Sequence, residues 1–237
     1  MNVLITGGSR GIGQACVEAF AAEGHKVVFL YRSRTAEAQK VCRLTGTHAV
    51  KADIAKSAAV DKAVAEAAEY MGGIDVLVNN AGVSHIGLLQ DMTDTDWRRV
   101  IDTDLSGAFY LSRAVIPHMV RQQAGRIINV GSMWGKTGAS CEAAYSAAKA
   151  GIRGLTMALA KELGPSGITV NCVEPGLIDT EMNAALDDDT KRALCDETPL
   201  GRIGTPRDVA NAVLFFASPA ASFITGQILG VDGGFAV

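Results

Sequence analysis

The fold is decided at the start of the chain, where residues 1–13 read MNVLITGGSRGIG. The apolar run Val3–Ile5 suits a short buried strand, and the glycines that follow it, Gly7, Gly11 and Gly13, precede a helical pattern. A glycine triplet alone would also suit a purely structural turn. Between a strand and a helix, however, glycines let the backbone approach a pyrophosphate, which then meets the N-terminus of the helix. This stretch therefore indicates a dinucleotide-binding fold.

The rest of the chain continues the alternation of strand and helix. Short continuous apolar runs favour parallel strands covered on both faces, and they lie at Val3–Ile5, Lys26–Leu30, His48–Ala52, Val76–Val78, Arg126–Val130, Thr169–Val173 and Ile228–Val231. Helical patterns between them include Gln14–Glu23, Ala58–Tyr70, Thr95–Gln122, Ala144–Leu163 and Pro206–Ala217. We expect residues 1–237 to form one α/β domain, a Rossmann-type doubly wound sheet of seven mostly parallel strands with helices on both faces.

Composition argues against several other classes of protein. The 237 residues are 48% hydrophobic and 20% charged with a net charge of -3, which gives no electrostatic reason to expect a nucleic-acid partner. No apolar run approaches the roughly 18–20 residues that span a bilayer, and the N-terminus lacks the features of a signal peptide. The cysteines are scattered and the histidines isolated, so we expect no disulfide, no bound metal and a cytoplasmic location.

The end of the second predicted strand favours NADP(H) over NAD(H). An acidic residue at this position accepts hydrogen bonds from the ribose of NAD, whereas arginine accommodates the 2′-phosphate of NADP. The segment reads Tyr31-Arg32-Ser33-Arg34 without an acid, and Arg10 lies in the glycine turn. Guanidinium groups match phosphate geometry, although one of Arg32 and Arg34 could equally be a solvated loop charge.

A tyrosine and a lysine four residues apart indicate the chemistry. Tyr145 and Lys149 share one face of a predicted helix, so we expect the ammonium group beside the phenol. A free tyrosine has a pKa of about 10, and a neighbouring positive charge lowers it. Together with Ser132 and the dinucleotide site, an activated phenol suggests hydride transfer to or from a carbonyl.

These motifs resemble the short-chain dehydrogenase/reductase family from Met1 to Val237. Besides the glycine turn and Tyr145-x-x-x-Lys149, the likeness is carried by Asn79-Asn80-Ala81-Gly82, Gly131-Ser132, Pro175-Gly176, Gly226-Gln227 and Asp232-Gly233-Gly234. The resemblance implies that Ser132 hydrogen-bonds the carbonyl oxygen and that Tyr145 is the general acid in reduction. It also implies that Lys149 binds the nicotinamide ribose and lowers the pKa of Tyr145.

The resemblance also implies a set of cofactor contacts. Asp53 and Ile54 would contact the adenine, Asn80 the ribose region, and Ile178 and Thr180 the nicotinamide amide. The full implied set is Gly7, Ser9, Arg10, Gly11, Ile12, Gly13, Arg32, Asp53, Ile54, Asn80, Ala81, Gly82, Tyr145, Lys149, Pro175, Gly176, Ile178 and Thr180.

One position departs from the family pattern. The family usually has asparagine where this chain has Asp104, and there it helps to hold a water in a proton relay that reaches the lysine. An ionised aspartate accepts hydrogen bonds and donates none, and its charge could alter both Lys149 and Tyr145. We include Asp104 among the catalytic candidates, with a water relay in an altered arrangement as the hypothesis. The alternative is that Asp104 only caps or kinks its helix.

Two groups within the family resemble the chain in more detail. Asn129-Val130-Gly131-Ser132, Gly167-Ile168-Thr169-Val170-Asn171 and Gly201-Arg202-Ile203-Gly204 look like 3-oxoacyl-[acyl-carrier-protein] reductases of fatty-acid synthesis. Residues 132–135 and 138–142 resemble the reductase that acts on 5-aminopentanone-modified elongation factor P. In that group Trp134 and Glu142 could line the substrate mouth, where a carboxylate suits a cationic amine. The alternative is a solvated loop acid beside a packing tryptophan.

These resemblances lead to one reading with alternatives. We expect an NADPH-dependent ketone reductase. The preferred interpretation is that its substrate is a 3-oxoacyl thioester, and the alternative is that its substrate is 5-aminopentanone-modified elongation factor P. A third reading, an NADPH-binding regulator whose chemistry has lapsed, is supported by Asp104 alone. Carrier-protein enzymes often have basic docking residues where this chain has Gln123 and Ser166, which weakens the acyl-carrier-protein assignment. By analogy with the family we expect a homotetramer.

Overall fold

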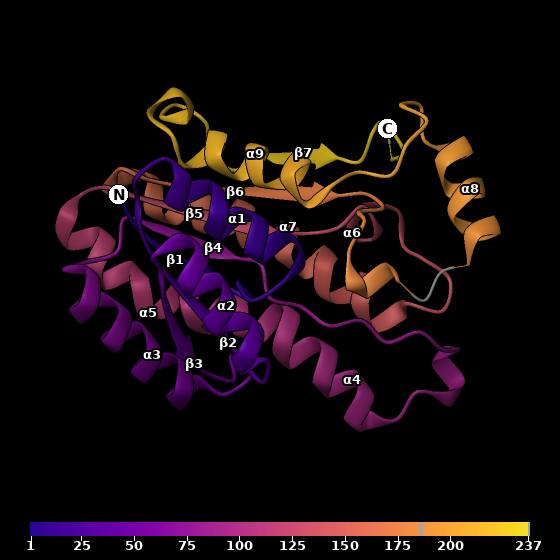
Figure 1. Cartoon of the computed structure of the whole chain (residues 1–237), viewed down its shortest axis with the longest axis horizontal. Helices are drawn as coiled ribbons and strands as arrows, with labels where there is room; N and C mark the ends of the chain where they lie inside the picture. The colour runs from indigo at the N-terminus through magenta and orange to yellow at the C-terminus, as the bar shows by residue number, and fades with distance from the viewer. Residues whose placement is uncertain (185–186, 237) are drawn as a thin grey trace.

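The computed structural model describes residues 1–184 and 187–236, in which seven strands form one parallel sheet (Figure 1). The strands are β1 (Asn2–Thr6), β2 (Lys26–Tyr31), β3 (His48–Lys51), β4 (Val76–Asn79), β5 (Gly125–Val130), β6 (Ile168–Pro175) and β7 (Ile228–Val231). Their order across the sheet is β3-β2-β1-β4-β5-β6-β7, so the chain reverses its direction of progress between β3 and β4. All seven predicted strands and the doubly wound fold are confirmed.

Helices cover both faces of this sheet. They are α1 (Gly11–Ala22), α2 (Thr35–Thr45), α3 (Ser57–Met71), α4 (Asp94–Ile101), α5 (Gly107–Gln122), α6 (Trp134–Thr137), α7 (Ala143–Leu163), α8 (Asp188–Glu197) and α9 (Pro206–Ala217). One apolar cluster joins the sheet to α1, α2 and α9, and a second joins its other face to α3, α5 and α7. Among the helices of residues 1–184 and 187–236, none combines the length and apolar character of a membrane span.

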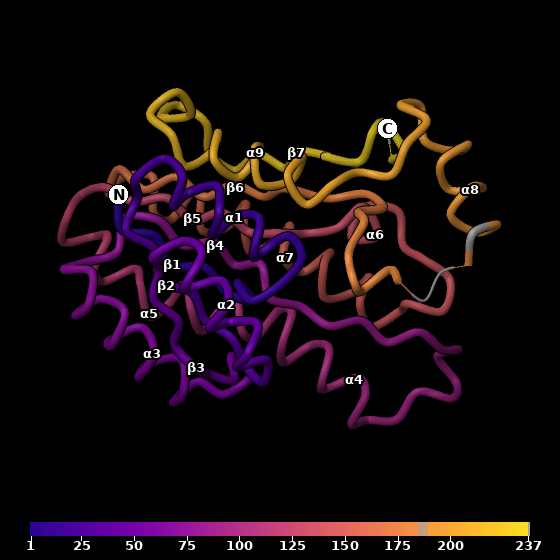
Figure 2. The backbone as a smooth tube through the Cα atoms, viewed as in Figure 1, coloured from indigo at the N-terminus to yellow at the C-terminus, as the bar shows by residue number. Residues whose placement is uncertain are grey.

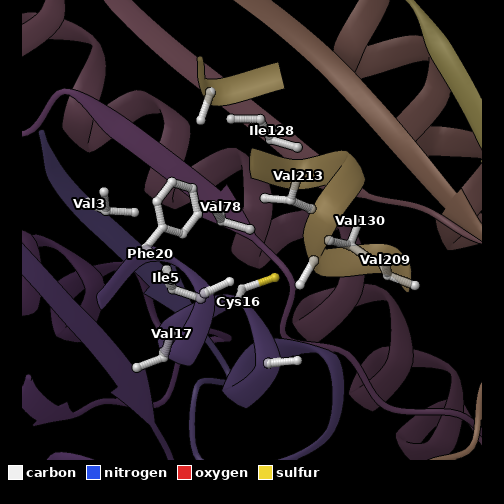
Figure 3. Packing of buried hydrophobic residues seen from close by; sticks show 14 of the residues in the cluster. Val3, Ile5, Cys16, Val17, Phe20, Val78, Ile128, Val130, Val209 and Val213 are labelled. Atoms are coloured by element: carbon white, nitrogen blue, oxygen red, sulfur yellow. The ribbon is translucent and has the colours of Figure 1, made fainter. Parts of the chain in front are cut away.

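The strands read as continuous apolar runs because both of their faces are buried. In β1, Val3 and Ile5 point into the first cluster while Leu4 points into the second. Figure 3 shows the Phe20 ring of α1 packed beside Val3 and Val78. Phe20 is completely buried, and burial of a side chain of this size contributes about 1.5–3 kcal/mol. The helices are thereby held against the sheet at fixed positions.

Local signals account for several helix ends. The α9 helix begins where expected, with Pro206 in its first turn and a capping box in which Asp208 N donates to Thr205 Oγ1 at 3.2 Å. The left-handed residues Gly46 and Gly72 end α2 and α3. Sequence periodicity did not single out α2, α6 or α8.

The predicted helix Thr95–Gln122 is interrupted. Helix α4 ends at Ile101, a π-helix (η2) spans Asp102–Ser106, and α5 begins at Gly107. The π-helical turn holds Asp104, and such turns inside α-helices frequently accompany functional sites. The tube in Figure 2 shows α4, α6 and α8 in the half of the molecule away from the N-terminus.

Candidate active site

The main cleft lies at the carboxyl ends of the strands. Ligands of doubly wound folds bind where the order of strands reverses, which here is the crevice between β1 and β4. The cleft has a volume of about 370 Å³, which falls within the size range of small-molecule sites. With the exception of Asp104, every site residue expected from the sequence lines this cleft. The structure therefore brings the predicted cofactor-binding residues and the predicted catalytic residues together in one cleft.

The glycine turn has the geometry needed for close backbone approach. Gly7 and Gly11 have positive φ angles of 69° and 54°, which favour glycine. A Cβ atom on Gly13 would lie 2.2 Å from the carbonyl oxygen of Gly7, so a larger residue cannot fit there. The turn leads directly into α1, whose first N–H groups lack intrahelical partners and can bind an anion. This cradle fits the pyrophosphate of a dinucleotide.

Thr6 fastens a second loop to the glycine turn. Its Oγ1 accepts hydrogen bonds from the backbone N–H groups of Asn80 and Ala81, each at 2.9 Å. The side-chain amide of Asn80 donates to the carbonyl oxygen of Thr6 at 2.8 Å. The loop after β4, Asn80-Ala81-Gly82, is thereby held at the floor of the cleft. Sequence reasoning assigned Asn80 to the cofactor and missed its role in joining two strand ends.

The arginines expected at the 2′-phosphate lie at the rim of the cleft. Arg32 is exposed there, while Arg10 and Arg34 approach one another from the glycine turn and from the end of β2. Both bind the same carboxylate oxygen, Glu181 Oε2, at 2.9 Å. Glu181 lies in the loop after β6 and was not singled out by its sequence. Its carboxylate shows that two guanidinium groups converge on one anion-sized position.

The remaining predicted cofactor contacts come from two loops. Asp53 lies in the loop after β3, where its carboxylate accepts a hydrogen bond from Ala55 N at 3.2 Å. Ile54 packs against Gly107, where an added Cβ would come within 2.9 Å. Ile178 is almost fully buried beside Gly204. These contacts position the walls of the cleft.

Ser132, Tyr145 and Lys149 meet at the end of β5. Ser132 follows that strand, and its Oγ accepts a hydrogen bond from Trp134 N at 3.2 Å. Tyr145 and Lys149 are on α7, and the Lys149 ammonium lies 5.4 Å from the centre of the Tyr145 ring. Lys149 Nζ also donates to the carbonyl oxygen of Val130 at 3.1 Å. Serine, phenol and ammonium thus face one end of the cleft.

The phenol differs from the sequence-based expectation. Burial raises the pKa of Tyr145 above its ordinary value, and this outweighs the lowering by Lys149 and by a hydrogen bond with Ser132. The expectation that the pKa of Tyr145 is lowered is wrong. The i,i+4 spacing predicts the neighbouring ammonium group, but it does not predict the burial of the phenol. Tyr145 therefore keeps its proton near neutral pH, as a proton donor requires.

Asp104 lies behind the wall of the cleft. Its side chain is completely buried, its Oδ1 accepts a hydrogen bond from Val83 N at 2.8 Å, and its Oδ2 lies 3.3 Å from Lys149 Nζ. A Cβ on Gly82 would approach that Oδ2 to 2.6 Å. Asp104 therefore touches the lysine directly.

The predicted substrate residues line the same cleft. The Trp134 indole packs edge-on against Phe235 with 5.8 Å between ring centres. Glu142 precedes α7, and burial raises the pKa of its carboxyl group. Cleft residues that the motifs did not reveal are Ile86, Met182 and Leu194, from the loops after β4 and β6 and from α8. These are single apolar residues outside the family motifs, so no signal in the sequence indicated them.

Known proteins resemble the chain over almost its full length. A family model described as enoyl-(acyl carrier protein) reductase matches residues 7–236. A 3-oxoacyl-[acyl-carrier-protein] reductase of Vibrio cholerae is 41% identical over 233 residues, covering 98% of this chain and 95% of the relative. The Escherichia coli enzyme of that name matches with the same values. The Staphylococcus epidermidis enzyme is 42% identical over 238 residues, with 98% of each chain covered.

Proposed function

The chain belongs to the short-chain dehydrogenase/reductase family, and from this membership we propose that it is an NADPH-dependent 3-oxoacyl-[acyl-carrier-protein] reductase. It is an oxidoreductase that interconverts a ketone and a secondary alcohol. The single observation that carries the reaction is the meeting of Ser132, Tyr145 and Lys149 in the cleft that also contains the glycine turn. The proposed substrate is inferred from the name that these three relatives share.

In the proposed reaction the protein stabilises charge on the carbonyl oxygen. A nicotinamide cofactor supplies the hydride when bound. Ser132 Oγ hydrogen-bonds the oxygen of the ketone, and the Tyr145 hydroxyl donates its proton to that oxygen as negative charge develops. Lys149 holds a positive charge beside the phenol, which stabilises the phenolate left after proton transfer. The raised pKa of Tyr145 is compatible with this direction, because the phenol is protonated when reduction begins.

NADP(H) is the proposed cofactor. The cradle at Gly7, Gly11 and Gly13 fits a pyrophosphate, and the convergence of Arg10 and Arg34 on one carboxylate oxygen supports a neighbouring 2′-phosphate site. Glu181 would have to leave these guanidinium groups for the phosphate to bind. Arg32 on the same rim is available as a further phosphate ligand.

The alternative substrate, modified elongation factor P, is not favoured. Glu142 does line the cleft, which suits a cationic amine, but burial raises the pKa of Glu142 and so disfavours its charged form. The relatives at 41–42% identity are named for the ketone of a 3-oxoacyl thioester. The family model's description names an enoyl substrate instead. We give the relatives more weight, because they match the individual chain rather than a broad family.

An acyl carrier protein and further copies of the chain are the proposed partners. Gln123 is exposed at the end of α5 without a charge, so carrier docking would use basic residues elsewhere on the surface. Trp97 on α4, Phe109 on α5 and Met157 on α7 are exposed apolar side chains on neighbouring helices. Their exposure favours a homotetramer in which a second copy of the chain covers these helices, with the C-terminal strand at a second interface. Light scattering of the purified protein tests this assembly.

A substrate panel tests the activity. Purified protein is mixed with NADPH and acetoacetyl-CoA, which imitates the carrier thioester, and oxidation of NADPH is followed by absorbance. We expect rapid reduction, with NADH a poorer cofactor. Slow reduction here together with turnover of aminopentanone-modified elongation factor P would overturn the substrate assignment. Binding of NADPH without reduction of any ketone would overturn the assignment as an enzyme.

A further inference from the structure

Asp104 and Lys149 form an ion pair inside the protein. Their side chains are 0% and 4% exposed, and Asp104 Oδ2 lies 3.3 Å from Lys149 Nζ. The two charges come from different elements, the π-helix η2 and helix α7. Each buried charge favours the ionised form of the other, because an unpaired charge is costly to bury.

The surrounding backbone is shaped to hold this pair. Asp104 Oδ1 accepts the backbone N–H of Val83, and Lys149 Nζ donates to the carbonyl oxygen of Val130. Gly82 provides the space, since a Cβ there would lie 2.6 Å from Asp104 Oδ2 and 3.3 Å from Lys149 Nζ. Among the described residues, Oδ2 accepts no hydrogen bond, so the ion pair with the ammonium is its main interaction.

We propose that Asp104 is a positioning residue, which fixes the Lys149 ammonium through a buried ion pair and balances its charge beside the Tyr145 phenol. An amide at this position could still accept the Val83 hydrogen bond but would carry no charge. The contact between Asp104 and Lys149 is direct, so this role needs no bridging water. The contacts of the Asp104 side chain with Val83 and Lys149 also lie outside its own helical segment, which favours this role over capping or kinking the helix.

The charge of Asp104 opposes the effect of Lys149 on the phenol. Lys149 lowers the pKa of Tyr145, whereas Asp104 raises it. Burial acts to lower the pKa of Lys149, but Asp104 and Tyr145 raise it, so the ammonium keeps its proton. Burial raises the pKa of Asp104 itself, against the lowering by Lys149 and by Val83 N–H. The further ionisable groups around these three are Arg99, Glu142 and Cys172.

The consequence is a wider alkaline range for reduction. Reduction needs the protonated phenol, so its rate falls as the pH rises through the pKa of Tyr145. In Asp104→Asn, Lys149 Nζ still donates to the carbonyl oxygen of Val130, and Tyr145 still raises the pKa of the ammonium, so we expect Lys149 to stay charged. Removal of the carboxylate charge then lowers the pKa of Tyr145, and the fall in rate occurs at a lower pH. Oxidation of an alcohol needs the phenolate, so its rate would begin to rise at a lower pH in the same variant.

The experiment compares Asp104→Asn with Asp102→Asn. Asp102 belongs to the same π-helix and is partly exposed, so the control removes a nearby charge without touching the pair. We measure kcat/KM for NADPH-dependent reduction of acetoacetyl-CoA across pH. The alkaline limb of the pH profile of kcat/KM should shift to lower pH by about 1 unit in Asp104→Asn and should not shift in Asp102→Asn. A lower plateau with an unmoved limb, or equal shifts in both variants, would overturn the proposal.

A second measurement does not depend on activity. Tyrosinate formation is followed by ultraviolet difference spectroscopy, and the signal of Tyr145 is isolated by subtracting a Tyr145→Phe protein with the same residue at position 104. Tyr145 should titrate at lower pH in Asp104→Asn than with aspartate present, and an unchanged titration would refute the inference. The kinetic test rests on the proposed function. If the wild type reduces no ketone, that function fails while the titration still decides the role of Asp104.

Discussion

Thr6→Val tests whether one hydroxyl joins the glycine turn to the loop after β4. Valine keeps the shape of threonine and removes the acceptor of two hydrogen bonds, from Asn80 N and Ala81 N at 2.9 Å each. An unsatisfied buried donor costs about 1–3 kcal/mol, and because these groups are partly buried we take about 1 kcal/mol each. The expected loss is therefore about 2 kcal/mol in the free energy of unfolding, or about 4–8 °C in Tm for a chain of this length.

The assay is thermal and urea unfolding, with NADPH affinity measured in parallel. Thr6→Ser is the matched control, because it keeps the hydroxyl and removes only a methyl group, at about 0.8 kcal/mol. We expect Thr6→Val to lose more stability than Thr6→Ser and to bind NADPH more weakly, since Asn80 and Gly82 line the cleft. If the valine variant equalled the serine variant in both measurements, the anchoring role of Thr6 would be refuted.

Two more predictions concern ion pairs. Glu181→Gln removes the carboxylate charge that competes with a phosphate for Arg10 and Arg34. Calorimetry should therefore show a severalfold lower dissociation constant for NADPH and no such change for NADH. Equal changes for both cofactors would contradict a phosphate site at these arginines. The pKa of Asp208 is lowered, and the largest cause is its hydrogen bonding with Arg202. The ionised Asp208 therefore contributes its full stabilisation of the folded protein at pH values above about 4, the pKa of an aspartate in the unfolded chain. This stabilisation is lost as the pH falls below that value toward the lowered pKa of the folded protein. Urea unfolding should show Asp208→Asn less stable than wild type at pH 7 and equal to it in strong acid, and a gap that persists in acid would count against this pairing.

The sheet could be predicted because parallel strands buried on both faces read as short continuous apolar runs, which alternate here with helical patterns. The runs around Val3–Ile5 and Thr169–Val173 each became a strand with slightly wider bounds. Helix α9 could be placed because Thr205-Pro206 marks its start chemically. Helix α2 lacks such a signal, since Ala38 and Val41 are its buried residues and most of its surface is polar or exposed.

The π-helix could not be predicted, because the apolar residues Ile101, Leu105 and Ala108 continue the helical spacing through Asp102–Ser106. The meeting of Glu181 with Arg10 was equally hidden, since their separation in sequence is 171 residues. Motif spacing brought Tyr145 and Lys149 together correctly. It gave the wrong direction for the phenol, because burial depends on packing that no local spacing encodes.

Tyr145→Phe tests the central claim most directly. It removes one hydroxyl from the cleft and keeps the ring, so the cofactor site should be undisturbed. We predict that kcat for reduction of acetoacetyl-CoA falls by about 100- to 10,000-fold, the usual contribution of a general acid, with NADPH affinity unchanged. Turnover close to that of the wild type would contradict a proton donor at Tyr145 and with it the reductase mechanism.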